Sequence, residues 1–235
     1  MFNSNGLEYS NGITLYNSFL HLFFPYRCLD CKIELLPNEP GICVFCQAGI
    51  EVVHLPIEPP PHLTVDDVEI YAFFYYKKQG VSQSLLHALK YIQRRSLCVY
   101  WGRSFARQLS PNIIGSLECL IPVPLHRKKK LIRGYNQSEL IAKGILTEFP
   151  HVHLNTSCIK RVKHTKSQTK KKRNDRLSDS SEVFDLLPFD IGSYKHVGIV
   201  DDVITTGATL MGIISLIRAR VPHIRITIFV LAVTK

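Results

Sequence analysis

The stretch VGIVDDVITTGATL, residues 197–210, decides the fold of this chain. An apolar run leads directly into the acid pair Asp201 and Asp202, and a turn rich in hydroxyls, with one glycine, follows. An apolar pattern with helical spacing then continues to residue 220. Short apolar runs are typical of buried strands, and a glycine-containing turn often separates a strand from a helix. The stretch therefore predicts a buried strand, a turn and a helix, with two carboxylates at the end of the strand.

The acid pair and the turn have the composition of a sugar-phosphate site. Three threonines and the flexible Gly207 can surround a phosphate, and the N–H groups that open the next helix add donors and a favourable dipole. A Walker-type loop would place a lysine after the glycine, and this turn has none. Because adjacent strand residues point to opposite faces, Asp201 and Asp202 suit ribose hydroxyls, with hydrated Mg²⁺ nearby, better than a shared proton. The alternative is a capping acid followed by an ordinary turn.

The rest of the chain alternates strand and helix patterns. Strands are predicted over residues 69–76, 117–123, 158–162, 196–200 and 224–233, and helices over 81–92, 101–109, 136–149 and 206–220. This alternation predicts an α/β fold with a mainly parallel sheet covered by helices on both faces. Ligands of such sheets bind beyond the carboxyl ends of the strands, which is where the acid pair is expected.

Two CxxC pairs precede this domain. Eleven residues separate Cys28 and Cys31 from Cys43 and Cys46. Each pair offers two thiolates, and four thiolates complete a tetrahedral Zn²⁺ site with no open position, so the zinc is expected to be structural. Four buried or redox-active cysteines are the alternative. The proline-rich stretch over 56–61 places the domain boundary near residue 60, between a zinc module over 1–60 and a domain over 61–235.

Positive charge is concentrated in one segment. The chain of 235 residues has 29 Lys and Arg residues and 19 Asp and Glu residues. Residues 126–176 contain 15 of the Lys and Arg residues but only 3 of the Asp and Glu residues, which gives this segment a net charge of +12. Such a segment is expected to meet phosphates, in a small substrate or in nucleic acid.

The composition also indicates a compartment. The apolar stretch over 13–24 lacks the charged start and the cleavage site of a signal peptide, and it is too short and polar to span a membrane. It is expected to form a short amphipathic helix. Paired cysteines without an export signal favour a reducing environment. We therefore expect a cytoplasmic protein without membrane insertion.

These motifs resemble those of the ComF family. IVDDVITTGAT, residues 199–209, looks like the loop that binds phosphoribosyl pyrophosphate (PRPP) in type I phosphoribosyltransferases, and the four cysteines match the zinc module of the family. IPVPLH over 121–126, RGYNQ over 133–137 and KHTKSQTKKKRNDR over 163–176 are similar to further family segments. The resemblance covers nearly all of residues 20–235. One departure is Asp179, which follows Arg176 where the family commonly has asparagine.

The resemblance implies a Rossmann-like phosphoribosyltransferase core with Asp201 and Asp202 as the catalytic residues, holding the ribose hydroxyls. It implies a loop for the 5-phosphate made of Val203, Ile204, Thr205, Thr206, Gly207, Ala208 and Thr209. It implies a pyrophosphate side made of Pro122, Val123, Pro124, Leu125, His126 and Arg133, with the cations of 127–130 beside it. Mg²⁺ and these cations would neutralise departing pyrophosphate while the acids favour a cationic sugar carbon.

The function implied by the resemblance has two versions. ComF proteins are associated with DNA uptake and natural transformation. In the first version the chain transfers phosphoribose from PRPP to an acceptor that the sequence does not identify. In the second it binds single-stranded DNA and keeps the PRPP pocket as a sensor or relic. The zinc module could also dock a protein partner, such as another competence protein.

The sequence allows a functional and a structural interpretation for each of two basic segments. In RGYNQ, Arg133 and Tyr135 could grip a phosphate and a base, or Gly134 and Asn136 could only turn the chain into a helix. The run over 170–173 is a solvated face, or a lid or nucleic-acid contact.

Overall fold

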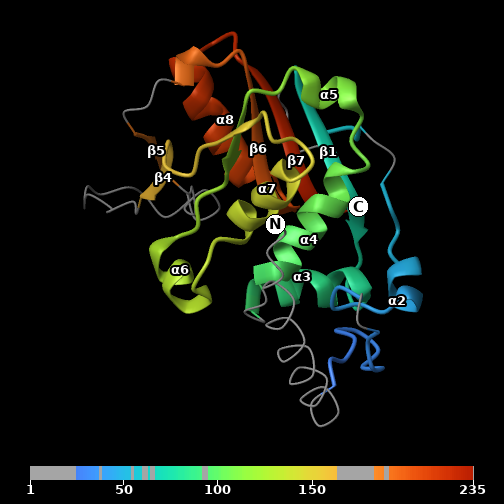
Figure 1. Ribbon diagram of the computed structural model, residues 1–235. Coiled ribbons are helices and arrows are strands. Elements are labelled where there is room, and N and C mark those ends of the chain that lie inside the picture. The colour runs from blue at the N-terminus through green and yellow to red at the C-terminus, as the bar shows by residue number, and fades with distance from the viewer. Residues whose placement is uncertain are drawn as a thin grey trace, which may run out of the picture. The chain divides into compact units, whose positions relative to one another are not determined.

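A computed structural model describes residues 25–36, 39–53, 56–59, 63, 67–91, 95–162, 183–187 and 191–234 (Figure 1). The chain divides into two compact units, Met1–Gly49 and Ile50–Lys235, which are described separately. The predicted helix over 13–24, the basic segment over 163–176 and Asp179 lie outside the described residues. The domain boundary near residue 60 stays a prediction.

The larger unit is built on a five-stranded sheet whose strand pairs are all parallel. In sheet order the strands are β1 (Val68–Tyr76), β7 (Arg225–Thr234), β6 (His196–Ile204), β2 (Cys119–Pro122) and β3 (His153–Leu154). The predicted α/β class with a mainly parallel sheet is thereby confirmed. In the centre of this sheet, β7 stays paired with β6 as far as Ile204, whereas β2 ends opposite Val200, so the last residues of β6 have a neighbouring strand on one side only.

Six helices connect these strands in the described part of the chain. They are α3 (Val81–Tyr91), α4 (Arg95–Ala106), α5 (Pro111–Gly115), α6 (Arg127–Arg133), α7 (Gln137–Leu146) and α8 (Ala208–Arg220). None of the described helices has the length and apolar character that a membrane span needs.

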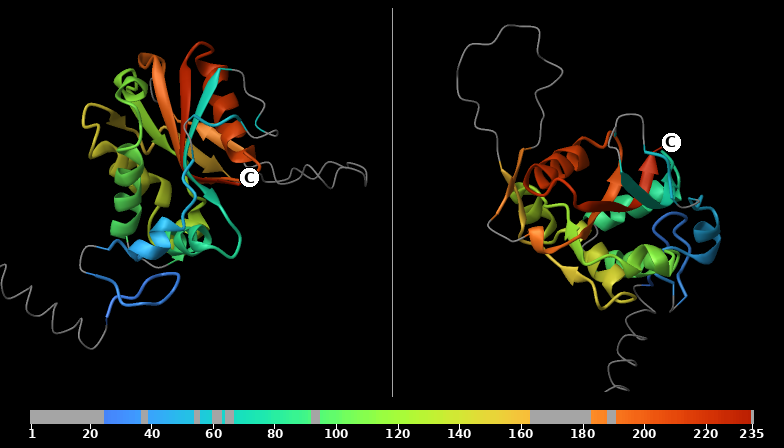
Figure 2. Two further views of the ribbon diagram at one scale, coloured as in Figure 1. Left: turned by 90° about the vertical axis from the view of Figure 1, so that its right-hand side faces the viewer. Right: turned by 90° about the horizontal axis from the view of Figure 1, so that it is seen from above.

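Helices cover both faces of the sheet, as the view from above in Figure 2 shows, with α8 on one side and α4 and α7 on the other. On the α8 side, Ile213 belongs to one buried cluster with strand residues such as Ile228. On the other side, Phe105 of α4 stacks on Phe73 with ring centroids 5.5 Å apart and meets Phe229 edge-on at 6.4 Å. The central strands are therefore buried on both faces, which explains their continuous apolar sequences.

The predicted strand over 158–162 forms but does not join the main sheet. It is β4 (Ile159–Val162), and it pairs antiparallel with β5 (Val183–Leu186) in a separate two-stranded sheet. β3, which the sequence patterns did not indicate, occupies the sheet edge beside β2 instead. Strand propensity is local, whereas the choice of partner depends on contacts between distant segments.

Two glycines let α4 and α7 approach at backbone distance. A Cβ atom built on Gly102 would clash with the carbonyl group of Ile141, and one built on Gly144 would clash with the carbonyl oxygen of Val99. Each helix thus places a glycine against the backbone of the other. This crossing fixes α7, whose first turn lies beside the end of β6.

The amino end of β6 holds a buried histidine that predicts acid sensitivity. His196 is 2% exposed, and its ring nitrogens lie 2.8 Å from Thr227 Oγ1 and 3.0 Å from Ser116 Oγ. Burial, and then the charge of Arg225, lowers the pKa of this imidazole. The unfolded chain therefore binds a proton at a higher pH than the folded one, near 6.5. The stabilising contribution is complete above that pH and is lost as pH falls toward the folded pKa.

We therefore expect the stability of wild type relative to His196→Gln, measured as the difference in their free energies of unfolding in urea, to fall as pH is lowered from 7.5 to 5.5. A glutamine keeps hydrogen-bonding groups without titrating, so it isolates the contribution of the imidazole from that of other titrating groups. A difference that stays constant across this range would show that His196 is not responsible.

Candidate functional site

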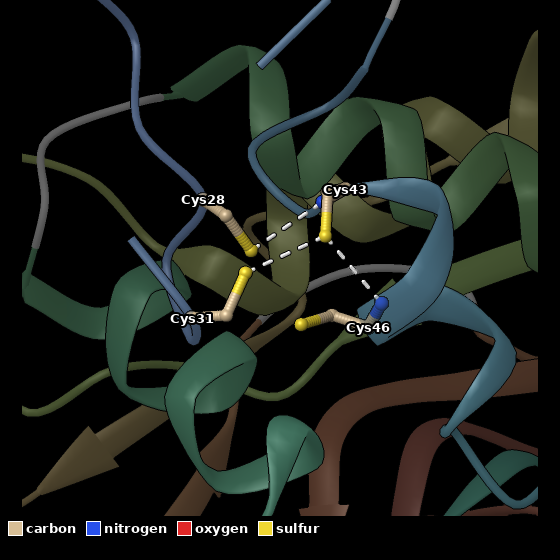
Figure 3. A group of neighbouring side chains, drawn as sticks. All are labelled: Cys28, Cys31, Cys43 and Cys46. Carbon is tan, nitrogen blue, oxygen red and sulfur yellow. Dashed lines mark hydrogen bonds between the residues drawn. The ribbon is translucent and has the colours of Figure 1, made fainter. Parts of the chain in front are cut away.

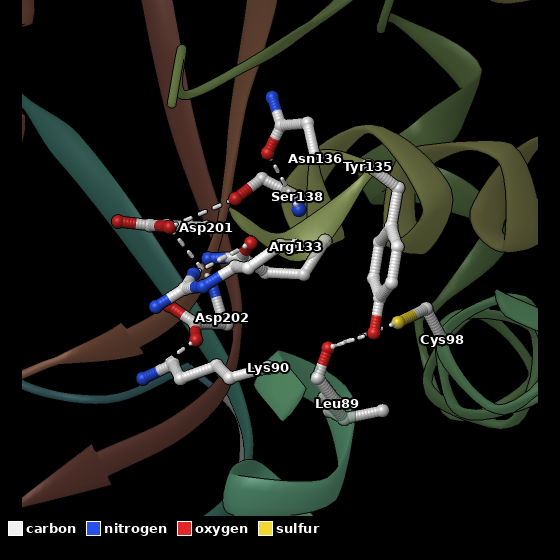
Figure 4. A network of polar contacts seen from close by, with 10 residues as sticks. Leu89, Lys90, Cys98, Arg133, Tyr135, Asn136, Ser138, Asp201 and Asp202 are labelled. Atoms are coloured by element: carbon white, nitrogen blue, oxygen red, sulfur yellow. Dashed lines mark hydrogen bonds and ion pairs between the residues drawn. The ribbon is translucent and has the colours of Figure 1, made fainter. Parts of the chain in front are cut away.

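The acid pair lies near the carboxyl end of β6, and Figure 4 shows the two side chains close to Ser138 and Lys90. Asp202 is 5% exposed, and Asp201 is partly exposed. Asp201 Oδ1 accepts hydrogen bonds from Ser138 Oγ at 3.0 Å and from the backbone N–H of Asp202 at 2.9 Å. Ser138 belongs to the first turn of α7, so the helix fixed by the glycine crossing also orients this carboxylate.

Lys90 is the cation that meets Asp202. Its Nζ lies 2.8 Å from Asp202 Oδ2, and only 24% of the lysine side chain is exposed. The sequence patterns did not single out this residue. The available signal was its place on α3, four residues after the buried Leu86 and directly after the buried Leu89, where a charged side chain needs a partner.

Burial makes the acid pair difficult to ionise fully. Burial raises the pKa of the Asp201 carboxyl to about 7, and the negative charge of Asp202 adds to the rise. The hydrogen bonds from Asp202 N–H and Ser138, and the charge of Lys90, act in the opposite direction. A ligand that brings hydroxyl donors or a cation would favour the doubly ionised pair.

The loop after the acids contains both structural and accessible positions. Thr205, Thr206 and Ala208 are exposed, Val203 and Thr209 are partly exposed, and Ile204 and Gly207 are buried.

Gly207 has a structural task in this loop. It begins α8 with φ 71°, a left-handed conformation that favours glycine, and a Cβ atom there would lie 2.9 Å from Leu63 Cδ1. A side chain at this position would therefore disturb the fold as well as the loop. The exposed threonines are the better probes of binding.

The predicted pyrophosphate side lies beside the acid pair. Pro122 pairs with Val200 on β6, and the N–H of Val123 donates to Val200 O at 2.9 Å. Pro124, Leu125 and His126 follow and are partly exposed. The structure thus places this segment beside Val200 of β6, the residue that directly precedes Asp201.

His126 begins the basic helix α6. Its Nδ1 accepts a hydrogen bond from the N–H of Lys128 at 3.3 Å, so it caps the helix. Residues 127–130 are all exposed cations, and Leu131 and Ile132 behind them are 84% and 76% exposed.

The RGYNQ segment is mainly structural. Tyr135 is 7% exposed and its hydroxyl donates to Leu89 O at 2.8 Å. Asn136 caps α7 and donates through Nδ2 to Val123 O at 3.0 Å. Gly134 ends α6 with φ 72°. These contacts favour the turn-forming interpretation over a tyrosine ring that stacks on a base.

Arg133 is also held by protein contacts. It is 9% exposed, donates to Gln137 Oε1 at 2.9 Å, and places its guanidinium 5.3 Å from the ring centre of Tyr91. Figure 4 shows its side chain directed toward the acid pair.

The four N-terminal cysteines come together as predicted (Figure 3). Their sulfur atoms all lie within 4.8 Å of one another, and the Sγ atoms of Cys31 and Cys43 are 3.6 Å apart. Sulfurs of a tetrahedral Zn²⁺ site, with Zn–S of about 2.3 Å, lie about 3.8 Å apart. Burial, and then the neighbouring sulfurs of Cys31, Cys43 and Cys28, raise the pKa of Cys46, and a bound cation would relieve this crowding. The cluster can hold a metal ion.

We expect protein purified without chelator to carry about one zinc ion per chain, as a structural four-thiolate site requires. Cys43→Ser should lose both the metal and much of the soluble protein, because small metal-binding units commonly need their metal to fold. Cys98→Ala, outside the cluster, should keep the zinc. Elemental analysis of the three proteins tests this, and a well-folded wild type without metal would contradict it.

No model of a known protein family matches this chain. Competence protein F of Haemophilus influenzae is 29% identical over 217 residues, which cover 83% of this chain and 92% of that protein. DNA utilization protein YhgH of Escherichia coli K12 is 27% identical over 220 residues, with the same coverages of 83% and 92%. Competence protein ComFC of Bacillus subtilis is 32% identical over 93 residues, 39% of this chain and 34% of that protein.

Proposed function

Because this chain belongs to the ComF family, we propose that it binds PRPP together with Mg²⁺ at the carboxyl end of β6 and takes part in DNA uptake. The observation that carries the proposal is the acid pair Asp201 and Asp202, followed by an accessible hydroxyl loop that leads into α8. Hydroxyl-rich loops at helix starts suit phosphates, and buried carboxylates suit the two ribose hydroxyls.

Each part of the site has a task in this proposal. The acids accept hydrogen bonds from the ribose hydroxyls, and the exposed Thr205 and Thr206 with the start of α8 hold the 5-phosphate. The segment over 122–126 faces the pyrophosphate, with the cations of α6 nearby. Mg²⁺ would supply charge neutralisation for the pyrophosphate, whose oxygens are ligands that this ion prefers. A transfer reaction would then need no covalent intermediate, because a cationic sugar carbon is stabilised by the carboxylates.

The names of the relatives support the biological role. Two are called competence proteins and one a DNA utilization protein, so we propose that this chain handles incoming DNA, in the cytoplasm and with other competence proteins as partners. The exposed cations of α6 favour contact with single-stranded DNA as a second activity. The acceptor of a transfer reaction is not part of this proposal. We also propose that the metal of the cysteine cluster is structural zinc.

The PRPP proposal is tested by thermal unfolding of zinc-loaded wild type with Mg²⁺ alone, PRPP alone and both. Since a ligand that binds only the folded state stabilises it, the melting temperature should rise clearly only with both. No rise with both ligands would remove the PRPP proposal and leave DNA binding as the function.

Contact of α6 with single-stranded DNA predicts a reduced salt dependence after charge removal. Changing Arg127, Lys128, Lys129 and Lys130 to glutamine should lower the slope of log K against log salt by up to about 3, at about 0.7 per lost contact. Changing Lys195, which is exposed just before β6, and Arg220, which is exposed at the end of α8, should leave the slope unchanged, because both lie at the amino ends of the parallel strands and α6 follows the carboxyl end of β2. Fluorescence anisotropy with a labelled oligothymidine measures both. An unchanged slope in the α6 variant would show that this helix does not meet DNA.

A further inference from the structure

Lys90 contacts the carboxylate of Asp202, which is the group that a bound metal ion or a ribose hydroxyl would also contact. Asp202 Oδ2 is buried and lies 2.8 Å from Lys90 Nζ, but the contact lacks the alignment of a directed hydrogen bond. It is an ion pair. An ion pair of this kind depends mainly on charge, so another cation can take the place of the ammonium.

The backbone beside Lys90 is held in place. The Tyr135 hydroxyl donates to the carbonyl oxygen of Leu89, and Tyr135 directly precedes the cap of α7. The end of α3 is thereby tied to the segment that orients Ser138 and Asp201 (Figure 4). Lys90 therefore meets Asp202 from a fixed element, and its position is coupled to the acid pair.

Burial explains why Asp202 needs a cation beside it. A carboxylate that is 5% exposed is costly when ionised alone, and the second acid next to it increases that cost. Without Lys90, a divalent ion would be the natural replacement, because two adjacent carboxylates attract it strongly.

We propose that Lys90 is a positioning residue that occupies the cation position at Asp202 and keeps free divalent ions out. Metal then enters only with an anionic ligand that draws the ammonium away from the carboxylate. The identification of that anionic ligand as PRPP rests on the proposed function. The exclusion of free divalent ions by Lys90 does not depend on it.

The test uses Mn²⁺ as the probe and the full zinc-loaded chain, with free Mn²⁺ measured by electron paramagnetic resonance. Lys90→Met should bind Mn²⁺ at least about tenfold more tightly than wild type, because a positive charge at contact distance from the ion is removed. Lys90→Arg should behave as wild type. Lys143→Met is the matched control, since Lys143 is a helical lysine paired 2.7 Å from Glu139. The double variant with Asp201→Asn should lose the gain, which assigns the ion to the acid pair.

Stability provides a second measurement if Lys90→Met folds poorly. Mn²⁺ should then raise its melting temperature more than that of wild type. Equal Mn²⁺ affinity in Lys90→Met and wild type, or an unstable variant that Mn²⁺ does not stabilise, would overturn the inference. A wild type that ignores PRPP while Lys90→Met gains Mn²⁺ binding would remove the proposed function and leave this inference standing.

Discussion

Gly144→Ala should leave the chain at least about 3 kcal/mol less stable, near the upper end of the usual cost of overpacking. The added Cβ would clash with the carbonyl oxygen of Val99 and lie 2.8 Å from the backbone nitrogen of Arg103. Both are backbone atoms of α4, so no side chain can rotate away and one helix must move. Such a loss is a large fraction of the 5–15 kcal/mol that typically stabilises a domain. Urea unfolding measures it directly.

Gly115→Ala is the matched control. This glycine ends α5, and a Cβ atom there would meet nothing within 4 Å. The substitution should be neutral or slightly stabilising, since alanine has less freedom in the unfolded chain. If Gly144→Ala were as stable as Gly115→Ala, the close crossing of α4 and α7 would be wrong. The placement of Ser138 beside Asp201 would then lose its support.

The central unit of the fold could be predicted from local sequence. The apolar run that ends at Asp201, the glycine turn and the helix after it are encoded within a few residues, and β6 and α8 form as predicted. The cysteine cluster is likewise encoded by spacing, because two CxxC turns leave few arrangements other than a shared metal site.

Features that depend on distant contacts could not be predicted in this way. Lys90 lies far from the acids in sequence and looks like any charged residue on the edge of an amphipathic helix. Gly102 and Gly144 carry no sign of the crossing they permit. β4 has the composition of a sheet strand, and only its partner β5 takes it out of the main sheet. In RGYNQ the residue types suit both a binding role and a turn, and the contacts of Tyr135 and Asn136 decide for the turn.

Asp201→Asn should separate binding from stability. An asparagine oxygen can still accept from Ser138 and from the N–H of Asp202, while the repulsion between the two neighbouring carboxylates disappears. Because the folded pKa of Asp201 is raised, its charge costs stability as pH rises from about 4 toward 7, and the neutral amide avoids that cost at pH 7.5. The variant should therefore melt at the same or a higher temperature than wild type. PRPP should nevertheless bind about ten- to a hundredfold more weakly, since a charge-assisted acceptor worth roughly 1.5–3 kcal/mol is lost.

The most direct test of the PRPP site is a calorimetric titration of PRPP into zinc-loaded wild type and Asp201→Asn, each with and without Mg²⁺. We expect PRPP to bind wild type only with Mg²⁺, and to bind the folded variant more weakly by about ten- to a hundredfold. Folded wild type that takes up no PRPP with Mg²⁺, or a variant that binds it as tightly as wild type, would rule out a PRPP site at the acid pair.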